Sequence, residues 1–381
     1  MKILLLSIFL SFFFTRLMAQ QSFELSGSVS LKTATISLLT QDSAIDDIDV
    51  ATRNGWYKLT GKISENFAYV CLVLEDSQTN IGSWYFFIKP GKMKIDISLN
   101  KKTGKYELSY HNIPFVNENR EYEKLKTIEN SKKLKILEFR RLNNYKKEVI
   151  ADSINGVYKL INDEWINTMI SFVKKDFNTY INLFIFNKEI ISSPIGRIRS
   201  SVDSLLNMYY SFSEELRNTK IGLHIETELL KRKRVAIGQF APAFSFTDSL
   251  LHQYRLTDLI KQKYVLLSFW DSGCKPCIQS FPMIKSLYTR YKDVLEIVYV
   301  SLDPMEVTWK KSLQRYKLPW INTCNLEPYV KDYNLQMLYN VQFVPQYFLL
   351  SKDSEIIYHN TQSGDNDDYE KLQETIKKLV E

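Results

Sequence analysis

Two cysteines, Cys274 and Cys277, stand one helical turn apart where an apolar run gives way to a helical pattern. At a helix N-terminus, free backbone N–H groups and the macrodipole stabilise a thiolate, and Lys275 adds a nearby positive charge. The second thiol can attack a mixed disulfide formed by the first and release the product. Pro276 is tolerated in the first helical turn and stiffens the loop. The spacing therefore predicts a redox-active dithiol.

Other uses of such a pair fit less well. A structural disulfide closing so short a loop would stabilise the fold by only about 2 kcal/mol through loss of chain entropy in the unfolded state. A c-type haem site needs His after the second cysteine, where Ile278 stands. A peroxidatic cysteine in the peroxiredoxin pattern needs Thr where the chain has Asp271. No second cysteine pair or histidine cluster is present for zinc, so we expect no metal and no cofactor.

Pro345 stands directly before an apolar strand-like segment that begins at Tyr347. Proline is allowed at the start of a strand because no ladder donor is lost there. In a cis peptide it would turn the backbone of Val344 toward the cysteine pair, whereas an ordinary trans proline would carry no such meaning. The cysteine motif upstream favours the cis interpretation.

The elements around these residues predict an α/β sandwich over residues 236–381. The apolar run 264–270 is typical of a buried parallel strand, and a helix over 274–291 follows it, kinked at Pro282. Asp303-Pro304 predicts an N-cap followed by proline at the first helical position. The remaining predicted elements are a strand at 295–302, a hairpin at 347–350 and 356–359, and a closing helix at 367–380.

Upstream, two further segments differ in character. Residues 20–111 contain seven short β-rich runs separated by turn signals, which predict a β-sandwich; they are 23–29, 33–39, 56–63, 67–74, 84–88, 92–99 and 106–110. Residues 112–235 carry apolar residues at three- and four-residue steps and predict a helical connector, with breaks near 192–194 and 218–219.

Composition limits the classes of protein that fit. The chain of 381 residues is 45% hydrophobic and 24% charged, which is globular and not disordered. Its four cysteines are too few for a disulfide scaffold, and Cys71 and Cys324 are expected to be buried thiols, with a third redox thiol at Cys324 or a bridge between the two as the alternatives. The net charge of +7 is too mild to favour nucleic acid.

The basic excess lies in 112–235, which holds 22 basic against 16 acidic residues. It is explained by a solvated helical face or, alternatively, by a docking surface for an acidic partner. At the N-terminus, Lys2, the apolar run 3–14 and Ala19 predict a signal peptide over residues 1–19. A retained membrane anchor is the alternative. Either way we expect the chain to be exported to the periplasm or cell envelope.

With these motifs in view, the chain resembles the thioredoxin superfamily, in particular the exported TlpA-like thiol-disulfide oxidoreductases. The resemblance covers residues 236–381 and is carried by Gly238, Ala241-Pro242-Ala243-Phe244, Asp248, Trp270, Cys274, Pro276, Cys277, Pro282, Ser301-Leu302-Asp303, Trp309, Trp320 and Val344-Pro345. It implies a thioredoxin-like fold with a central mixed sheet.

The resemblance also implies roles. Cys274 would be the nucleophile, Cys277 the resolving thiol and Pro345 the cis-proline opposite them, all three catalytic. Trp270 would pack beside the pair and, with Lys275 and Val344, bind substrate. The substrates would be protein thiols and disulfides, and a membrane electron donor would re-reduce the pair.

Two departures from the family bear on this function. Thioredoxin has a buried carboxylate where this chain has Ser268, and some relatives have Glu where it has Ser280. Either acid would accept the proton of the resolving thiol. Their absence motivates an alternative, a non-catalytic envelope scaffold with a degenerate module. More loosely, residues 20–111 resemble a β-sandwich domain of unknown function found before such modules, which would bind an envelope partner.

Overall fold

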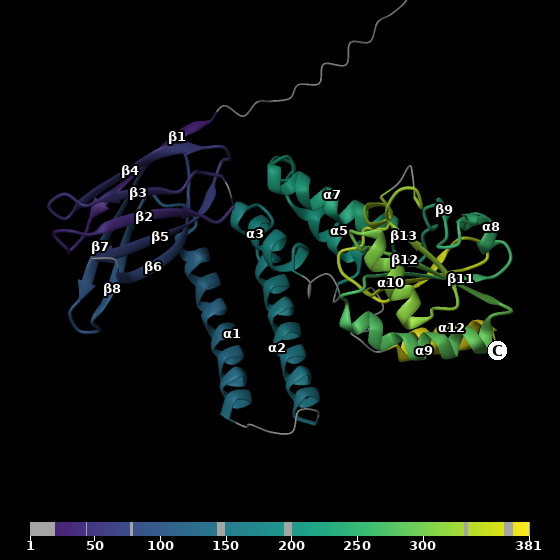
Figure 1. The fold of residues 1–381 in the computed structure, drawn as a ribbon. Helices are drawn as coiled ribbons and strands as arrows, with labels where there is room; N and C mark the ends of the chain where they lie inside the picture. Colours follow the sequence, from purple (N-terminus) through teal and green to yellow (C-terminus); the bar gives the residue numbers. More distant parts are fainter. Residues whose placement is uncertain are drawn as a thin grey trace, which may run out of the picture. The chain divides into compact units, whose positions relative to one another are not determined.

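The computed structural model describes residues 20–42, 44–76, 79–142, 149–193, 200–330, 334–361 and 369–380. They form two compact units, 1–144 and 145–381 (Figure 1). The division falls inside the segment 112–235 that the sequence presents as one helical connector. The predicted signal peptide, 1–19, lies outside the described residues.

The first unit contains a β-sandwich. Its strands are β1 (Gln21–Ser28), β2 (Thr35–Thr40), β3 (Ile48–Ala51), β4 (Trp56–Ile63), β5 (Ala68–Asp76), β6 (Thr79–Ile88), β7 (Gly91–Asn100) and β8 (Lys105–His111). They make two four-stranded sheets, in the orders β4-β1-β7-β8 and β3-β2-β5-β6. Leu25 and Ile95 of the first sheet share one buried core with Leu38 and Leu72 of the second. The predicted all-β architecture is confirmed.

One strand of this first unit was not predicted by the sequence analysis. β3 is a four-residue edge strand in which half-buried Ile48 and Val50 alternate with exposed Asp49 and Ala51. Because the stretch before it is acidic and the alternation is so short, the pattern does not distinguish it from a loop. It pairs with β2 in antiparallel register.

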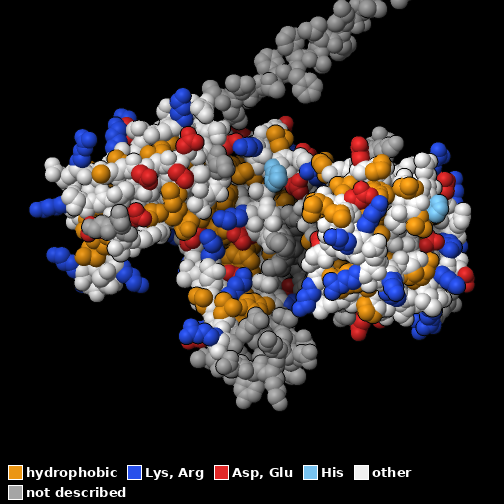
Figure 2. Space-filling model, viewed as in Figure 1, with side chains coloured by type: hydrophobic (Ala, Val, Ile, Leu, Met, Phe, Trp, Pro, Cys, Tyr) orange, Lys and Arg blue, Asp and Glu red, His pale blue; other side chains and the backbone are white. Residues whose placement is uncertain are grey.

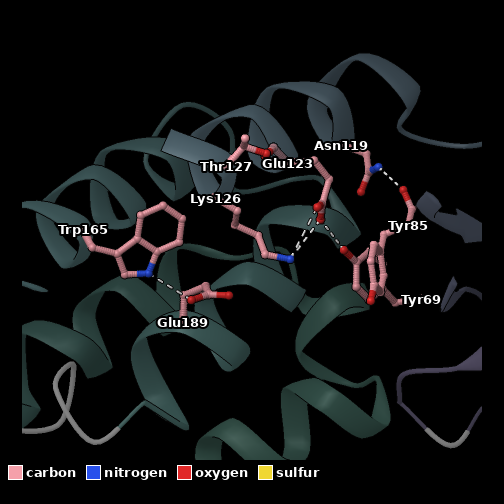
Figure 3. Close-up of polar contacts among 8 residues, drawn as sticks. All are labelled: Tyr69, Tyr85, Asn119, Glu123, Lys126, Thr127, Trp165 and Glu189. Carbon is pink, nitrogen blue, oxygen red and sulfur yellow. Dashed lines mark hydrogen bonds and ion pairs between the residues drawn. The ribbon is translucent and has the colours of Figure 1, made fainter. Parts of the chain in front are cut away.

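Helix α1 (Val116–Leu142) follows the sandwich and is fastened to it by polar contacts (Figure 3). The Tyr69 hydroxyl on β5 donates to the Glu123 carboxylate at 2.5 Å, and the Asn119 amide donates to the Tyr85 carbonyl on β6 at 2.6 Å. Lys126, one turn on, pairs with Glu123 at 3.2 Å. The first turns of α1 therefore belong to the sandwich.

The second unit begins with helices. They are α2 (Val149–Val173), α3 (Tyr180–Ile185), the π-helix η1 (Phe186–Ile191), α5 (Val202–Ser211), α6 (Glu214–Arg217) and α7 (Lys220–Arg234). The Trp165 indole donates to Glu189 at 3.0 Å and ties α2 to η1 (Figure 3). The predicted break at 218–219 is confirmed, since Thr219 caps α7. At the other end of α7, Arg234 donates to the carbonyls of Met337 and Leu338 at 3.1 and 2.7 Å.

Residues 236–380 form the predicted α/β architecture. The elements are β9 (Ser245–Thr247), β10 (Gln253–Arg255), α8 (Leu256–Ile260), β11 (Tyr264–Trp270), α9 (Lys275–Tyr291), β12 (Leu295–Ser301), α10 (Glu306–Tyr316), β13 (Ile321–Cys324), α11 (Leu335–Leu338), β14 (Gln346–Leu350), β15 (Ile356–His359) and α12 (Glu370–Val380). β13, β12 and β11 run parallel, and β14 and β15 extend the sheet antiparallel. The predicted terminal hairpin is confirmed.

The central strand β11 is buried on both faces. Leu266 and Trp270 belong to one core cluster with α9 and α12, whereas Val265, Leu267 and Phe269 belong to a second cluster on the opposite face with α8. Successive side chains point to opposite faces of a strand, so a strand covered on both sides must be apolar throughout. Here Ser268 is the exception, completely buried on the α9 face.

The prediction that Asp303 caps the next helix is wrong. α10 begins at Glu306 and its N-cap is Met305. The Asp303 carboxylate instead accepts hydrogen bonds from Ser301 Oγ at 2.6 Å and from the backbone N–H of Ser272 at 3.2 Å. Competition from these donors explains why the capping motif fails.

Surface charge and helix hydropathy also bear on the expectations from the sequence. Figure 2 shows basic and acidic side chains interspersed on the visible face of each unit, and on α7 Lys231 and Lys233 pair with Glu228 and Asp203. No helix within the described part of the chain combines the length and hydropathy needed to cross a membrane.

Candidate active site

The turn between β11 and α9 presents the cysteine pair. The Asp271 side chain accepts from Gly273 N at 2.8 Å, and its carbonyl accepts from Cys274 N at 3.2 Å. Cys274 is the N-cap of α9, with extended backbone angles, and Pro276 lies in the first helical turn. The turn chemistry thus delivers Cys274 to the end of the helix where backbone N–H groups lack partners.

The two sulfurs form a disulfide with an Sγ–Sγ distance of 2.05 Å. The Cys277 backbone N–H also donates to Cys274 Sγ at 3.1 Å. Cys274 is 9% exposed and Cys277 only 1%. An incoming sulfur therefore meets Cys274 first, and a thiolate formed there keeps a backbone donor and the helix macrodipole.

The buried carboxylate of Asp303 accepts hydrogen bonds from this turn. Asp303 is 4% exposed and accepts from both the backbone N–H and the hydroxyl of Ser272, and from Ser301 Oγ. β12 and β11 run parallel, so their carboxyl ends lie side by side. Asp303, just after β12, therefore lies close to Ser272 in the turn after β11. The sequence analysis matched Asp303 to the family but missed this role.

The Val344–Pro345 peptide is cis. The Asn360 side chain donates to the Pro345 carbonyl and accepts from Tyr347 N, both at 3.0 Å. Val344 packs against the core cluster that contains both cysteines. The fold therefore brings together the cysteine turn and the proline strand, which are far apart in the sequence.

At the two positions where relatives carry an acid, this chain has the buried hydroxyl side chains of Ser268 and Ser280. Ser280, one turn after Cys277, donates to the Cys277 carbonyl at 2.7 Å and lies 2.8 Å from the Tyr347 hydroxyl. Tyr299 and Ser268 lie in the same cluster, and burial raises the pKa of both tyrosines, Tyr299 and Tyr347. Only the strand register could have revealed this group, because Ser268 is opposite Tyr299 on one side and Tyr347 on the other.

Comparison with known proteins agrees with this geometry. Residues 262–356 match a family model described as thioredoxin-like. The thiol-disulfide oxidoreductase ResA of Geobacillus kaustophilus is 35% identical over 161 residues, spanning 41% of this chain and 88% of that protein. This chain belongs to the thioredoxin-like thiol-disulfide oxidoreductases.

Other relatives match the same part of the oxidoreductase. ResA of Bacillus subtilis is 28% identical over 33% of this chain and 68% of that protein. Among solved structures, the thioredoxin domain of a Bacteroides vulgatus thiol-disulfide oxidoreductase is 27% identical, with a TM-score of 0.33, and covers 38% of this chain and 99% of that chain. The β-sandwich and the helices α1 to α7 lie outside the residues 262–356 that match the family model.

Of the substrate-binding residues predicted for the oxidoreductase, Trp270 needs correction. It has no exposed surface and packs edge-on against Phe281, with ring centroids 5.5 Å apart. A substrate cannot touch a fully buried ring; Trp270 instead belongs to the buried core cluster that contains Cys274 and Cys277. Lys275 is exposed and Val344 is half-buried, so both remain within reach of a substrate.

The other two cysteines of the oxidoreductase take no part in the disulfide. Cys71 and Cys324 are free and buried, and they belong to different units. Burial raises the pKa of both thiols, that of Cys324 to about 12. Neither is a reactive thiolate at neutral pH. Among the described residues, no cluster of His, Cys, Asp or Glu could hold a metal ion.

Proposed function

We propose that this oxidoreductase reduces or exchanges disulfides in exported proteins through Cys274 and Cys277. The observation that carries the proposal is the asymmetric burial of a disulfide at the N-terminus of α9, beside a cis-proline strand. Cys274, the less buried of the two at 9% exposure, is also the one whose sulfur accepts from a backbone N–H, which would stabilise its thiolate.

In the proposed cycle, the Cys274 thiolate attacks a substrate disulfide. A bond forms between Cys274 and one substrate sulfur, and the other substrate sulfur leaves with the electron pair. Cys277 then attacks Cys274 Sγ, which forms the internal disulfide and releases the second substrate sulfur. The substrate is reduced by two electrons and the pair is oxidised. A membrane electron donor returns the two electrons and two protons, and no further cofactor takes part.

Substrate contact in this proposal comes from the rim of the pair. Lys275 and Val344 flank the sulfurs, and Phe343, 40% exposed, adds apolar surface before the cis-proline. An exposed apolar residue in the loop before the buried strand β14 suits an extended segment of an unfolded or flexible protein substrate. We propose further that residues 20–111 bind an envelope partner and take no part in the redox step, since their cysteine, Cys71, is single and buried.

The test is a trapping experiment with the full chain. A Cys277→Ser variant should accumulate mixed disulfides with client proteins through Cys274, whereas Cys274→Ser should accumulate none. The adducts should disappear on treatment with a reductant. If no reducible adduct forms at Cys274, the catalytic proposal fails and the scaffold alternative gains support.

The proposed compartment is the periplasm or cell envelope, reached through residues 1–19. Fractionation of cells expressing the chain, followed by alkylation of thiols before lysis, reports both the location and the redox state of the pair. Retention in the cytoplasm would overturn this part of the proposal. Equilibration with glutathione then gives the reduction potential, which separates a reducing from an oxidising role.

A further inference from the structure

A row of hydroxyl side chains crosses the centre of the sheet beneath the cysteine pair. Ser268 on β11 is flanked in register by Tyr299 on β12 and Tyr347 on β14. All three are at most 1% exposed. The small Ser268 side chain leaves the two larger rings to occupy the space under α9.

Hydrogen-bond counting fixes the direction of the contacts. Ser280 has a single hydroxyl hydrogen, and the Cys277 carbonyl can only accept, so Ser280 donates to it at 2.7 Å. In the 2.8 Å contact with Tyr347, the phenol must therefore be the donor and Ser280 the acceptor. The hydroxyl hydrogens of Ser280 and Tyr347 are therefore both used in these two hydrogen bonds, and neither is available to the sulfur of Cys277.

The same two residues join the cysteine turn to the proline strand. Tyr347 is two residues after Pro345, and its backbone N–H is held by Asn360, which also holds the Pro345 carbonyl. Ser280 lies in the first turns of α9 and bonds to the carbonyl of Cys277. The hydroxyl pair is thus a direct link between the turn that carries Cys277 and the strand that follows the cis-proline.

No acid takes part in this cluster. Among the described residues from 145 onward, the buried carboxylates are Asp248 and Asp303. Asp248 accepts from the backbone of Leu250 and His252, and Asp303 is occupied by Ser272 and Ser301. Burial keeps the pKa of Tyr347 well above its ordinary value, so the phenol stays neutral at physiological pH.

We propose that Ser280 and Tyr347 are positioning residues that hold the Cys277 turn against β14, and that the Cys277 proton leaves to a base in the solvent rather than to a group in the protein. This inference rests on the proposed roles of Cys274 and Cys277. In the step, hydroxide or buffer base takes the thiol proton and the Cys277 thiolate attacks Cys274 Sγ. The Cys274–substrate bond breaks, and the departing substrate sulfur takes the electron pair and then a proton from water.

Stopped-flow kinetics with dithionitrobenzoate separates the two thiol steps. Reduced full-length protein in excess should release one thionitrobenzoate as Cys274 attacks, at a rate that depends on protein concentration. A second thionitrobenzoate should follow as Cys277 resolves the adduct, at a rate that does not. Cys277→Ser should show the first release alone, which verifies the assignment of the two phases and tests the proposed function separately.

In the wild-type protein, the second phase should accelerate about tenfold per pH unit up to the pKa of a thiol, with no further ionisation at acidic pH. Tyr347→Phe and Ser280→Ala should slow it about five- to tenfold at every pH, as expected for one lost hydrogen bond. The midpoint of the pH profile and the first phase should not change. Ser280→Thr keeps a hydroxyl and should restore much of the rate.

Tyr339→Phe is the matched control. Tyr339 is also a buried phenol, hydrogen-bonded to the Pro242 carbonyl at 2.6 Å, but it belongs to the core on the opposite face of the sheet. It should leave both phases unchanged. An acidic plateau or ionisation in the wild type would identify an internal carboxylate base, and a shifted midpoint in Tyr347→Phe would show that the phenol carries the proton. Either result, or an unaltered second phase in both Tyr347→Phe and Ser280→Ala, overturns the proposal.

Discussion

The Asp303 carboxylate offers a sharp test of how the cysteine turn is held. Two interpretations of this residue give opposite results for one substitution. As the N-cap suggested by the sequence, Asp303 could be replaced by Asn at little cost, because Asn and Asp are about equally good caps. As the anchor of the Ser272 turn, it needs two acceptor oxygens, and Asn offers one.

The magnitude follows from the contacts. Asp303 is 4% exposed and accepts from Ser301 Oγ and from two groups of Ser272. A hydrogen bond to a charged group contributes about 1.5–3 kcal/mol, and removal of a shared acceptor leaves buried donors unpaired. We expect Asp303→Ala to cost about 3–5 kcal/mol and Asp303→Asn about 1–3 kcal/mol.

Differential scanning calorimetry of the full chain measures this effect. For a unit of this size, each kcal/mol lowers the transition temperature by about 2–4 °C, so Asp303→Ala should lower the transition of residues 145–381 by roughly 6–20 °C. The transition of the β-sandwich should not move. Asp248→Asn is a control, because it removes a buried carboxylate of the same unit that does not contact the Ser272 turn. It should leave both thionitrobenzoate phases unchanged. Asp303→Asn should slow the first phase. An Asp303→Asn protein with wild-type stability and wild-type kinetics would refute the anchor.

Three further expectations follow from burial and charge. Burial lowers the pKa of His359 to about 3, below the 6.5 expected when unfolded. The free energy of unfolding of its unit should therefore be highest above pH 6.5 and fall by about 1.4 kcal/mol per pH unit between pH 6.5 and pH 3. His359→Gln should remove this slope in acid-unfolding calorimetry, and an identical slope would contradict the expectation. Tyr69→Phe should destabilise the β-sandwich unit by about 1.5–3 kcal/mol through loss of the Glu123 contact, and an unchanged sandwich transition would show that contact to be dispensable. In the reduced native protein at pH 8, iodoacetamide should label Cys274 far faster than Cys324, since burial raises the pKa of Cys324 to about 12; equal labelling in peptide mass spectra would argue against a buried thiol.

The sequence predicted the elements whose signals are local. The run 264–270 is continuous and apolar because the strand is buried on both faces, and the helix after it is marked by a proline in its first turn. The cis peptide at Pro345 could be predicted only because the cysteine motif lies upstream, since a proline before an apolar strand is compatible with a trans peptide as well. For the cysteine pair, residue type and spacing were enough to locate the reactive turn.

What the sequence missed depends on partners distant in the chain. Asp303 looked like a cap because its neighbours fit one, but parallel pairing of β11 and β12 brings Ser272 within reach. Tyr347 was predicted only as the start of an apolar strand, and the pairing of β14 with β11 is what places its hydroxyl at Ser280. The edge strand β3 is too short, and the stretch before it too acidic, for alternation to reveal it.

The contact between α7 and the loop before the cis-proline has a practical consequence for dissecting this protein. A fragment beginning at residue 236 would contain the whole family match, residues 262–356, and look like an independent module. It would nevertheless lose Val235, a fully buried member of the core, and Arg234, which holds the last carbonyls of α11 shortly before Pro345. We expect such a fragment to keep its thiol chemistry but to recognise substrates with a less ordered proline loop. Substrate selection is therefore best measured with the helices attached.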